Sequence, residues 1–299
     1  MLITILPEIL DKVGAKSRLF NQDWKSGAHM PFKWIVVTAG VGSSEIEAAA
    51  QRVARTARRL PGVARAVAVL TNDLAAVCPK TKQVYGHLQN SNHRGYGYMA
   101  YKSEIVGNAF DGFWGDFDGV IWIDAGCEIL VNPISSLRMK YFQKFARKHS
   151  AFTFVLQSLE IEHTKRDLFE RFKPINPRET GNQIQSTWFL LTGEKGKRIS
   201  ELWSTVTLEN SNFLSDDKSK LPEFPEFRVN RTDQSVFSLT CKSLGVTISS
   251  YIPASGDGSM VGKIRAATHP IWVSRNRTGT SIIPKYLQML SNLFYRPKR

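Results

Sequence analysis

The chain has 299 residues, of which 42% are hydrophobic and 22% charged, and its formal net charge at pH 7 is +14. The composition is typical of a globular protein, and the lack of repeats or low-complexity tracts excludes solenoids and disordered chains. No apolar run approaches the roughly 20 residues of a membrane-spanning helix, and residues 1–12 lack the basic region and cleavage site of a signal peptide.

The excess of positive charge favours an anionic partner: nucleic acid, an acidic lipid surface or a phosphorylated substrate. The cysteines, Cys78, Cys127 and Cys241, are widely spaced, odd in number and without a C-x-x-C pair. They therefore indicate neither a disulfide framework nor a structural zinc site. We expect a reducing compartment, with the cytoplasm as the default.

The first predicted elements are a strand, a helix and a strand. Residues 34–39 are a β-branched run typical of a buried strand. Ser44 is expected to be the N-cap of the helix, with Glu47 completing a capping box. The arginines of this helix are expected to lie mainly away from its apolar face; they are Arg52, Arg55, Arg58 and Arg59. Strand 64–71 follows, which completes a unit that builds parallel sheets.

The remaining predicted elements are helix 99–113, strand 119–124, basic amphipathic helix 134–148, strand 152–157, strand 186–192, helix 232–244 and strand 246–251. In helix 134–148 the residues expected to share one buried face are Leu137, Tyr141, Phe142 and Phe145. The order predicts a single α/β domain over 1–299, with a mainly parallel sheet flanked by helices. Its first half is 34–150 and its more irregular second half 151–280.

A basic amphipathic tail is predicted over 281–299. From Ile282 onward, apolar residues recur at helical spacing, and the segment ends in Arg296, Lys298 and Arg299. One interpretation is a helix packed on the domain. The other is peripheral attachment to an anionic membrane surface, and the pattern leaves both open.

The position of each carboxylate relative to the strand 119–123 separates two candidate sites. In open α/β sheets, ligands bind beyond the carboxyl ends of the strands. Asp116 and Asp118 form a literal Asp-x-Asp, but they precede the strand, which predicts a surface turn. Asp124 ends the strand and is followed by Ala125 and Gly126, whose small side chains would let a diphosphate approach the backbone. A charge ending so apolar a strand is costly unless it is used.

Residues 120–129, Val-Ile-Trp-Ile-Asp-Ala-Gly-Cys-Glu-Ile, resemble the Asp-Ala-Gly-Cys-Glu signature of a group of bacterial GT-A-like glycosyltransferases, a variant of their Asp-x-Asp motif. Further segments similar to that group, in the same order, are 95–102, 164–169 with 181–191, and 231–239. Together they span about residues 34–250.

The resemblance implies a GT-A-like fold and a hexosyltransferase type of enzyme. Such an enzyme moves a sugar from a nucleotide-sugar donor to a cell-surface polysaccharide, lipopolysaccharide or related glycan. Residues 34–150 would bind the nucleotide sugar, and 151–280 would form the acceptor side. The enzyme would be cytoplasmic, with attachment to the inner face of the membrane as an open alternative.

The resemblance also implies roles for single residues. Those expected at the donor are Thr38, Lys102, Asp124, Ala125 and Gly126. Asp233 and Gln234 would be catalytic and contact the transferred sugar or the acceptor. A divalent cation, Mn²⁺ or Mg²⁺, would be held by Asp124 with Glu128 or His269.

One departure from the family pattern bears on the metal. Gly126 stands where the ordinary Asp-x-Asp has its second carboxylate, so the metal is either held by the remaining ligands or absent. In the second case basic side chains would neutralise the leaving diphosphate. The general base also stays open among Asp233, Glu162 and Asp167, and with it the choice between retention and inversion.

Two rival patterns are weaker. Residues 95–100 match a G-x-G-x-x-A dinucleotide fingerprint, but no buried strand precedes them, which disfavours a nicotinamide site. Basic residues mixed with aromatic ones at 138–145 and 295–299 suggest a nucleic-acid-binding protein as the alternative function. No helix-turn-helix, zinc-finger or ribonucleoprotein signature accompanies them.

Overall fold

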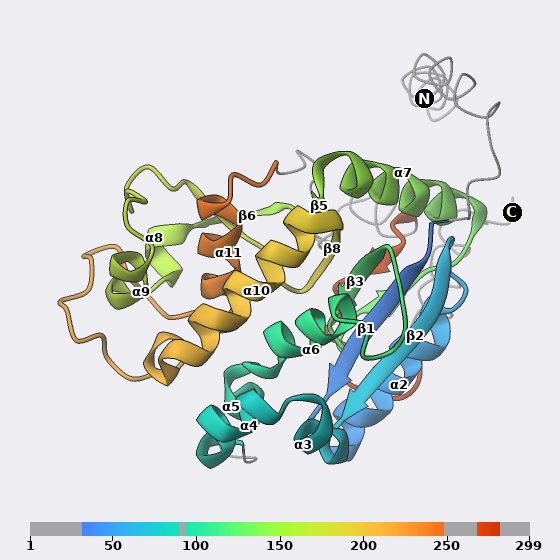
Figure 1. The fold of residues 1–299 in the computed structure, drawn as a ribbon, viewed down its shortest axis with the longest axis horizontal. Helices are drawn as coiled ribbons and strands as arrows, with labels where there is room; N and C mark the ends of the chain where they lie inside the picture. The colour runs from blue at the N-terminus through green and yellow to red at the C-terminus, as the bar shows by residue number, and fades with distance from the viewer. Residues whose placement is uncertain (1–31, 90–93, 248–267, 282–299) are drawn as a thin grey trace, which may run out of the picture. The chain divides into compact units, whose positions relative to one another are not determined.

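The computed structural model describes residues 32–89, 94–247 and 268–281, and those from Lys33 onward belong to one compact unit. At its centre is a five-stranded sheet (Figure 1) in the order β2 (Val63–Leu70), β1 (Trp34–Gly40), β3 (Gly119–Ile123), β8 (Trp188–Thr192) and β5 (Ala151–Phe152). β1 is parallel to β2 and β3, whereas β8 is antiparallel to β3 and β5. Four of the five strands therefore share one direction, which confirms the predicted α/β class.

Helices cover both faces of this sheet, and strand alternation decides which side chains meet them. Ile35, Val37 and Trp122 share the core that contains α6 (Tyr101–Phe110) and α10 (Gly193–Glu209). The opposite face carries α2 (Ser44–Ala57), which contacts β1 and β2, and α7 (Pro133–His149), which contacts β5 and β8. None of the helices in the described ranges is long and apolar enough to cross a bilayer.

The shorter elements, in chain order, are η2 (Thr71–Asp73), α3 (Leu74–Val77), α4 (Pro79–Tyr85), η3 (Gly86–Leu88), α5 (Gly95–Tyr98), β4 (Glu128–Ile129), β6 (Val155–Leu159), α8 (Glu160–His163), α9 (Arg166–Arg171), β7 (Asn182–Ile184), η4 (Ser211–Phe213) and β9 (Ile271–Trp272). α11 (Asp233–Ser243) confirms the helix predicted over 232–244. The strand predicted over 152–157 is interrupted, because β5 ends at Phe152 and β6 begins at Val155. Of the strand predicted over 246–251, the first two residues are not in a strand, and the rest, like the tail from Ile282, lie outside the described residues.

The N-terminus of α2 differs from the prediction by one residue. The N-cap is Ser43, whose Oγ accepts a hydrogen bond from the Ile46 N–H at 3.4 Å. Because the cap lies one residue earlier, Glu47 cannot complete the expected box. Its carboxylate accepts from the Thr71 N–H at 3.1 Å instead, and so links α2 to the end of β2.

Helix α10 was not predicted. It packs between α6 and α11, and Trp203 on α10 meets Phe237 at 4.9 Å between ring centroids. Phe237 in turn stacks on Phe189 of β8 at 4.5 Å. The helix begins with Gly193, at φ +63°, and also contains Gly196, which packs against the backbone of Leu191. Two glycines in a polar Gly-Glu-Lys-Gly run are typical of a loop, and this concealed the helix.

The limits of α7 agree with the prediction, but the face expected to be buried is wrong in part. Phe142 is fully buried and stacks on Phe152 at 4.3 Å. Leu137 and Tyr141 are instead 54% and 49% exposed. The helix buries the stripe of Met139, Phe142 and Ala146, rotated from the one expected.

Gly40 provides a test of how α2 packs on β1. A Cβ at this position would lie 2.3 Å from the Ile46 carbonyl oxygen and 2.7 Å from the Glu47 Cα. We expect Gly40→Ala to lower the free energy of unfolding by about 1–3 kcal/mol, because only a shift of the α2 backbone relieves the overlap.

Gly107 in α6 is the matched control, since a Cβ there meets no atom within 4 Å. Gly107→Ala should leave stability unchanged or raise it by up to about 1 kcal/mol. Urea unfolding of both variants makes the comparison. Equal effects would show that close packing at Gly40 is not a constraint.

Candidate functional site

An ammonium group and two carboxylates meet at the carboxyl end of β3. The Lys102 Nζ, from α6, lies 2.9 Å from Asp124 Oδ1 and 2.8 Å from Asp233 Oδ2. It also donates to the Ser186 carbonyl oxygen at 3.4 Å. Lys102 is 2% exposed and Asp233 4%. The three residues come from α6, the end of β3 and the start of α11, so the fold joins distant parts of the chain here.

The alternation along β3 explains why Asp124 points to Lys102. Trp122 belongs to the core shared with α6, whereas Ala125 packs with Ala49 and Ala50 of α2. Asp124, two residues after Trp122, therefore lies on the α6 face. The Trp122 indole Nε1 also donates to Asp124 Oδ1 at 2.7 Å, which fixes the carboxylate.

The charges of this group stabilise one another. Burial by itself lowers the pKa of Lys102, but the neighbouring Asp124 and Asp233 carboxylates outweigh it and raise that pKa above its usual value. Burial raises the pKa of Asp124, and the Lys102 charge acts against that shift. Lys102 is accordingly an ammonium ion over the whole physiological range.

These side chains line an open pocket of about 230 Å³. Arg94, Arg231 and Gln234 line the same pocket. Gln234 is oriented by its neighbours, since its Nε2 donates to Gln183 Oε1 at 2.7 Å and its Oε1 accepts from the Ser186 N–H at 3.5 Å. The pocket therefore brings together Lys102, Asp124, Asp233 and Gln234, four of the residues singled out from the sequence.

The backbone beside the pocket is unusual. Thr232, directly before Asp233, has φ +50°, a value that β-branched residues rarely adopt. Tyr96, Tyr98 and Met99 also have positive φ, and the last two line the pocket. Conformations of this kind cluster at functional sites, where the surrounding structure holds them in place.

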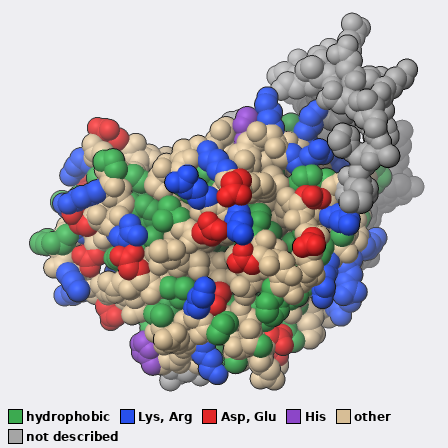
Figure 2. Space-filling view, viewed as in Figure 1, with side chains coloured by type: hydrophobic (Ala, Val, Ile, Leu, Met, Phe, Trp, Pro, Cys, Tyr) green, Lys and Arg blue, Asp and Glu red, His purple; other side chains and the backbone are tan. Residues whose placement is uncertain are grey.

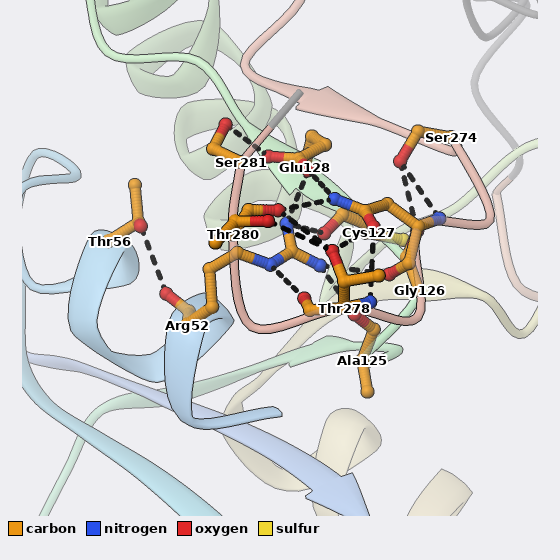
Figure 3. Close-up of polar contacts among 11 residues, drawn as sticks. Arg52, Thr56, Ala125, Gly126, Cys127, Glu128, Ser274, Thr278, Thr280 and Ser281 are labelled. Carbon is orange, nitrogen blue, oxygen red and sulfur yellow. Dashed lines mark hydrogen bonds and ion pairs between the residues drawn. The ribbon is translucent and has the colours of Figure 1, made fainter. Parts of the chain in front are cut away.

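Figure 3 shows a second buried ion pair, which fixes the loop after β3. Arg52 of α2 lies 2.6 Å from Glu128, and the two side chains are 5% and 2% exposed. The guanidinium group also donates to the carbonyl oxygens of Cys127, Ala125, Asn276 and Thr278. Glu128 further accepts from the Asn276 amide and from Ser281. Arg52 thus ties Ala125 and Cys127 of the loop to Asn276 and Thr278.

Sequence reasoning missed Arg52, because the arginines of this helix were expected to lie mainly away from its apolar face. The available signal was its position three residues after Ala49, on the face that the structure buries. Arg55, by contrast, is exposed as expected.

The three predicted metal ligands are not brought together. Glu128 pairs with Arg52, and His269 is fully buried against the rings of Phe142 and Trp188. The His269 Nδ1 accepts from the Ile271 N–H, and burial lowers the pKa of His269 to about 3. In the part of the chain that the structure describes, no group of three or more His, Cys, Asp or Glu residues is placed to hold a metal ion.

The two carboxylates that do meet, Asp124 and Asp233, both contact the Lys102 ammonium group. The side chains as they are arranged therefore do not fit a divalent cation, and the ligand set implied by the sequence resemblance is corrected accordingly.

Other candidates lie elsewhere. Thr38 is fully buried on β1, does not line the pocket, and its Oγ1 has no hydrogen-bond partner among the described residues. Asp116 and Asp118 are exposed in the loop before β3, as the sequence predicted. Of the possible bases, Glu162 pairs with Arg228, and Asp167 accepts from the backbone of Lys220 and Leu221. Neither lines the pocket, whereas Asp233 does.

Comparison with known proteins gives similarities to solved structures. No family model matches the chain, and no curated protein matches it. Mouse xyloside xylosyltransferase 1 in its apo form is similar with a TM-score of 0.41 and 13% identity, over 83% of this chain and 100% of that one. The galactosyltransferase LgtC, in complex with donor and acceptor sugar analogues, is similar with a TM-score of 0.40 and 10% identity, over 88% of this chain and 98% of that one. The bifunctional glycosyltransferase WbbM, in its apo structure, is similar with a TM-score of 0.36 and 8% identity, over 82% of this chain and 46% of that one.

The Arg52–Glu128 pair gives a test of how the loop is held. Removing one member leaves the other charge buried and unpaired, so Arg52→Met and Glu128→Leu should each cost about 3–5 kcal/mol. The double variant should cost clearly less than the sum of the two, because it leaves no lone charge.

Chemical unfolding of the three variants measures these differences. Arg55→Met, an exposed arginine on the same helix, serves as control and should change stability by less than about 0.5 kcal/mol. Additive costs in the double variant would contradict a coupled pair.

Proposed function

We propose that this chain is a glycosyltransferase that moves a sugar from a nucleotide-sugar donor to a glycan acceptor. The observation that supports it best is the pocket at the carboxyl end of β3, where Lys102, Asp124 and Asp233 meet. This is the edge of an α/β sheet at which ligands bind. The pocket combines cations, which suit a diphosphate, with carboxylate and amide groups, which suit sugar hydroxyls.

Each side chain then has a role that fits its position. Lys102, Arg94 and Arg231 supply positive charge for the diphosphate, whose negative charge grows as the bond to the sugar breaks. Asp233 and Gln234 bind hydroxyl groups of the transferred sugar or the acceptor. Asp124 holds the Lys102 ammonium group in place, whereas Ala125 and Gly126 do not line the pocket, and Ala125 packs against α2 on the other face of the sheet.

The choice of donor sugar and acceptor rests on the resemblance of residues 120–129 and 231–239 to bacterial GT-A-like glycosyltransferases. We propose a hexosyl donor and, as acceptor, a cell-surface polysaccharide, a lipopolysaccharide or a related glycan. The three cysteines are free and buried, which suits the cytoplasm. A nucleic-acid-binding function is not favoured, because the pocket sets carboxylate and amide groups beside its cations, and such groups suit sugar hydroxyls rather than a run of phosphates.

The proposal is tested by thermal shift of the purified protein with UDP-, GDP-, CMP- and dTDP-sugars. One nucleotide class should raise the melting temperature, since a ligand at a hundredfold excess over its Kd stabilises the native state by about 2.7 kcal/mol. Asp124→Asn should abolish both this shift and sugar transfer, because Lys102 loses a partner that positions it.

Asp116→Asn is the matched control, an exposed carboxylate before the same strand, and it should keep the shift and the activity. A folded Asp124→Asn protein with full activity would remove Asp124 from the site. No shift with any nucleotide sugar would argue against the transferase.

We also propose that α7 attaches the enzyme to an anionic membrane surface. Three large apolar side chains on this helix, Ile134, Leu137 and Tyr141, are about half exposed and lie at spacings of three and four residues. The helix contains no acidic residue, and its basic residues are Arg138, Lys140, Lys144, Arg147 and Lys148. Figure 2 shows Lys and Arg side chains over this part of the molecule. An apolar stripe flanked by cations suits the interface of a bilayer with acidic lipids.

Flotation with lipid vesicles tests this attachment. The protein should bind vesicles containing phosphatidylserine and not those of phosphatidylcholine alone. Leu137→Ser/Tyr141→Ser should weaken binding roughly tenfold, since much of the apolar area would be lost. Leu221→Ser/Val229→Ser changes two apolar residues elsewhere that are 41% and 46% exposed and should leave binding intact. Equal loss in both double variants, or binding without acidic lipid, would contradict the assignment to α7.

A further inference from the structure

We propose that the Lys102 ammonium group takes the place of a divalent cation, so that the pocket binds the diphosphate of its donor without a metal ion. The inference rests on the proposed function, because it concerns how the same pocket receives a nucleotide sugar.

Oxygen atoms surround the ammonium group of Lys102. An ammonium ion has three N–H donors, and the Lys102 Nζ has three oxygen neighbours: Asp124 Oδ1, Asp233 Oδ2 and the Ser186 carbonyl. Carboxylate, carbonyl and water oxygens suit Mg²⁺ and Mn²⁺. The lysine therefore occupies the position in which these oxygens would otherwise hold a cation.

The surrounding fold holds Lys102 in place. Its side chain is almost fully buried on α6, between Tyr101 and Ser103, which are buried as well. The Nζ lies 5.5 Å from the centre of the Trp122 ring, close enough for a favourable cation–π contact. A divalent ion bound between the same carboxylates would meet a positive charge that the surrounding structure keeps in place.

The other expected ligands have other partners. Gly126 has no carboxylate to offer, Glu128 is held by Arg52, and His269 is enclosed by aromatic rings. Among the described residues, what remains is the Asp124–Asp233 pair, and Lys102 offsets one of its two negative charges.

The pocket is also suited to an anion by its charge. The charged side chains that line it are Arg94, Lys102, Arg231, Asp124 and Asp233. Lys102 and Arg231 balance the two carboxylates, and Arg94 is paired with Asp216 at 2.8 Å outside this lining, so an anionic ligand would compete with Asp216 for Arg94. The contact of Lys102 with the Ser186 carbonyl is the longest of its three, at 3.4 Å, so this N–H is the one best placed to turn to a phosphate oxygen. Arg94 and Arg231 add further donors.

The decisive experiment measures Mn²⁺ binding and nucleotide binding separately. Electron paramagnetic resonance counts bound Mn²⁺ on the wild-type protein and on Lys102→Met, without nucleotide. Wild type should bind none at a Mn²⁺ concentration at which Lys102→Met binds one ion, because the substitution frees both carboxylates. Lys165→Met removes another buried lysine, whose Nζ donates to the backbone and side-chain oxygens of Asn212, and should bind none.

The thermal shift with the active nucleotide sugar is then repeated in EDTA and in Mn²⁺. The wild-type shift should be the same in both. Lys102→Met should bind the donor at least tenfold more weakly in EDTA and recover part of this loss in Mn²⁺. A wild-type shift that requires Mn²⁺, or one Mn²⁺ bound to the wild-type protein, would overturn the inference.

The two proposals fail in different ways. If no nucleotide sugar binds under any condition, the transferase assignment fails. The Mn²⁺ counts still decide the inference about Lys102, since equal counts in wild type and Lys102→Met overturn it. If Lys102→Met does not fold, the wild-type measurements in EDTA and Mn²⁺ carry the decision alone.

Discussion

The buried Lys102 ammonium group pairs with the carboxylates of Asp124 and Asp233. This pairing constrains how α6 and the end of β3 meet the start of α11. A buried charge is tolerated only when it is paired and hydrogen-bonded. Lys102 of α6 therefore requires both Asp124 after β3 and Asp233 at the start of α11. Because β8 runs against β3, its amino end brings Ser186 and Thr187 to the same edge of the sheet. The Asp124 N–H donates to the Thr187 carbonyl oxygen, so backbone and side chains close the site together.

On the opposite face of the sheet, the Arg52 guanidinium group pairs with buried carbonyl oxygens and with a buried carboxylate. The loop from Ala125 to Cys127 turns carbonyl oxygens inward, where water cannot reach them, and Glu128 follows with a buried charge. A guanidinium group offers five donors in a rigid plane, more than an ammonium group has. One arginine can thus serve the loop, Glu128 and the segment 274–281 at once. The two buried cations therefore differ in role: Arg52 fixes the loop after β3, and Lys102 lines the pocket.

Local patterns were enough to predict most of the sheet. The apolar runs of β1 and β3 are fully buried, and their limits agree with the prediction to within one residue. The face of α7 was assigned wrongly because Leu137 and Tyr141 look as apolar as Phe142, and only the position of β5 decides which of them is covered. Helix α10 was missed because its glycines, which allow close packing, also resemble a loop.

Part of the candidate site was predictable from the sequence, Asp124 from its position at the end of a strand and Lys102 and Asp233 from the family resemblance. The rule that ligands bind at the carboxyl ends of strands selected Asp124 over Asp116 and Asp118. Lys102 and Asp233 were found only through the resemblance, since 131 residues separate them and no local pattern joins them. The assignment of Glu128 to a metal could not be corrected from the sequence. Its true partner, Arg52, lies on a helix whose arginines were expected to face mainly away from the sheet.

The network around Arg52 has a mechanical consequence. Ser281 is hydrogen-bonded to Glu128, and Asn276 and Ser274 both bond to the Gly126 carbonyl oxygen. The last described residues of the chain are therefore fastened to the loop that follows β3 (Figure 3). A displacement of Ser281 would act first on Glu128, and one of Asn276 on Gly126, which lies two residues from Asp124. The position of segment 274–281 is thus coupled to the edge of the pocket through the loop after β3.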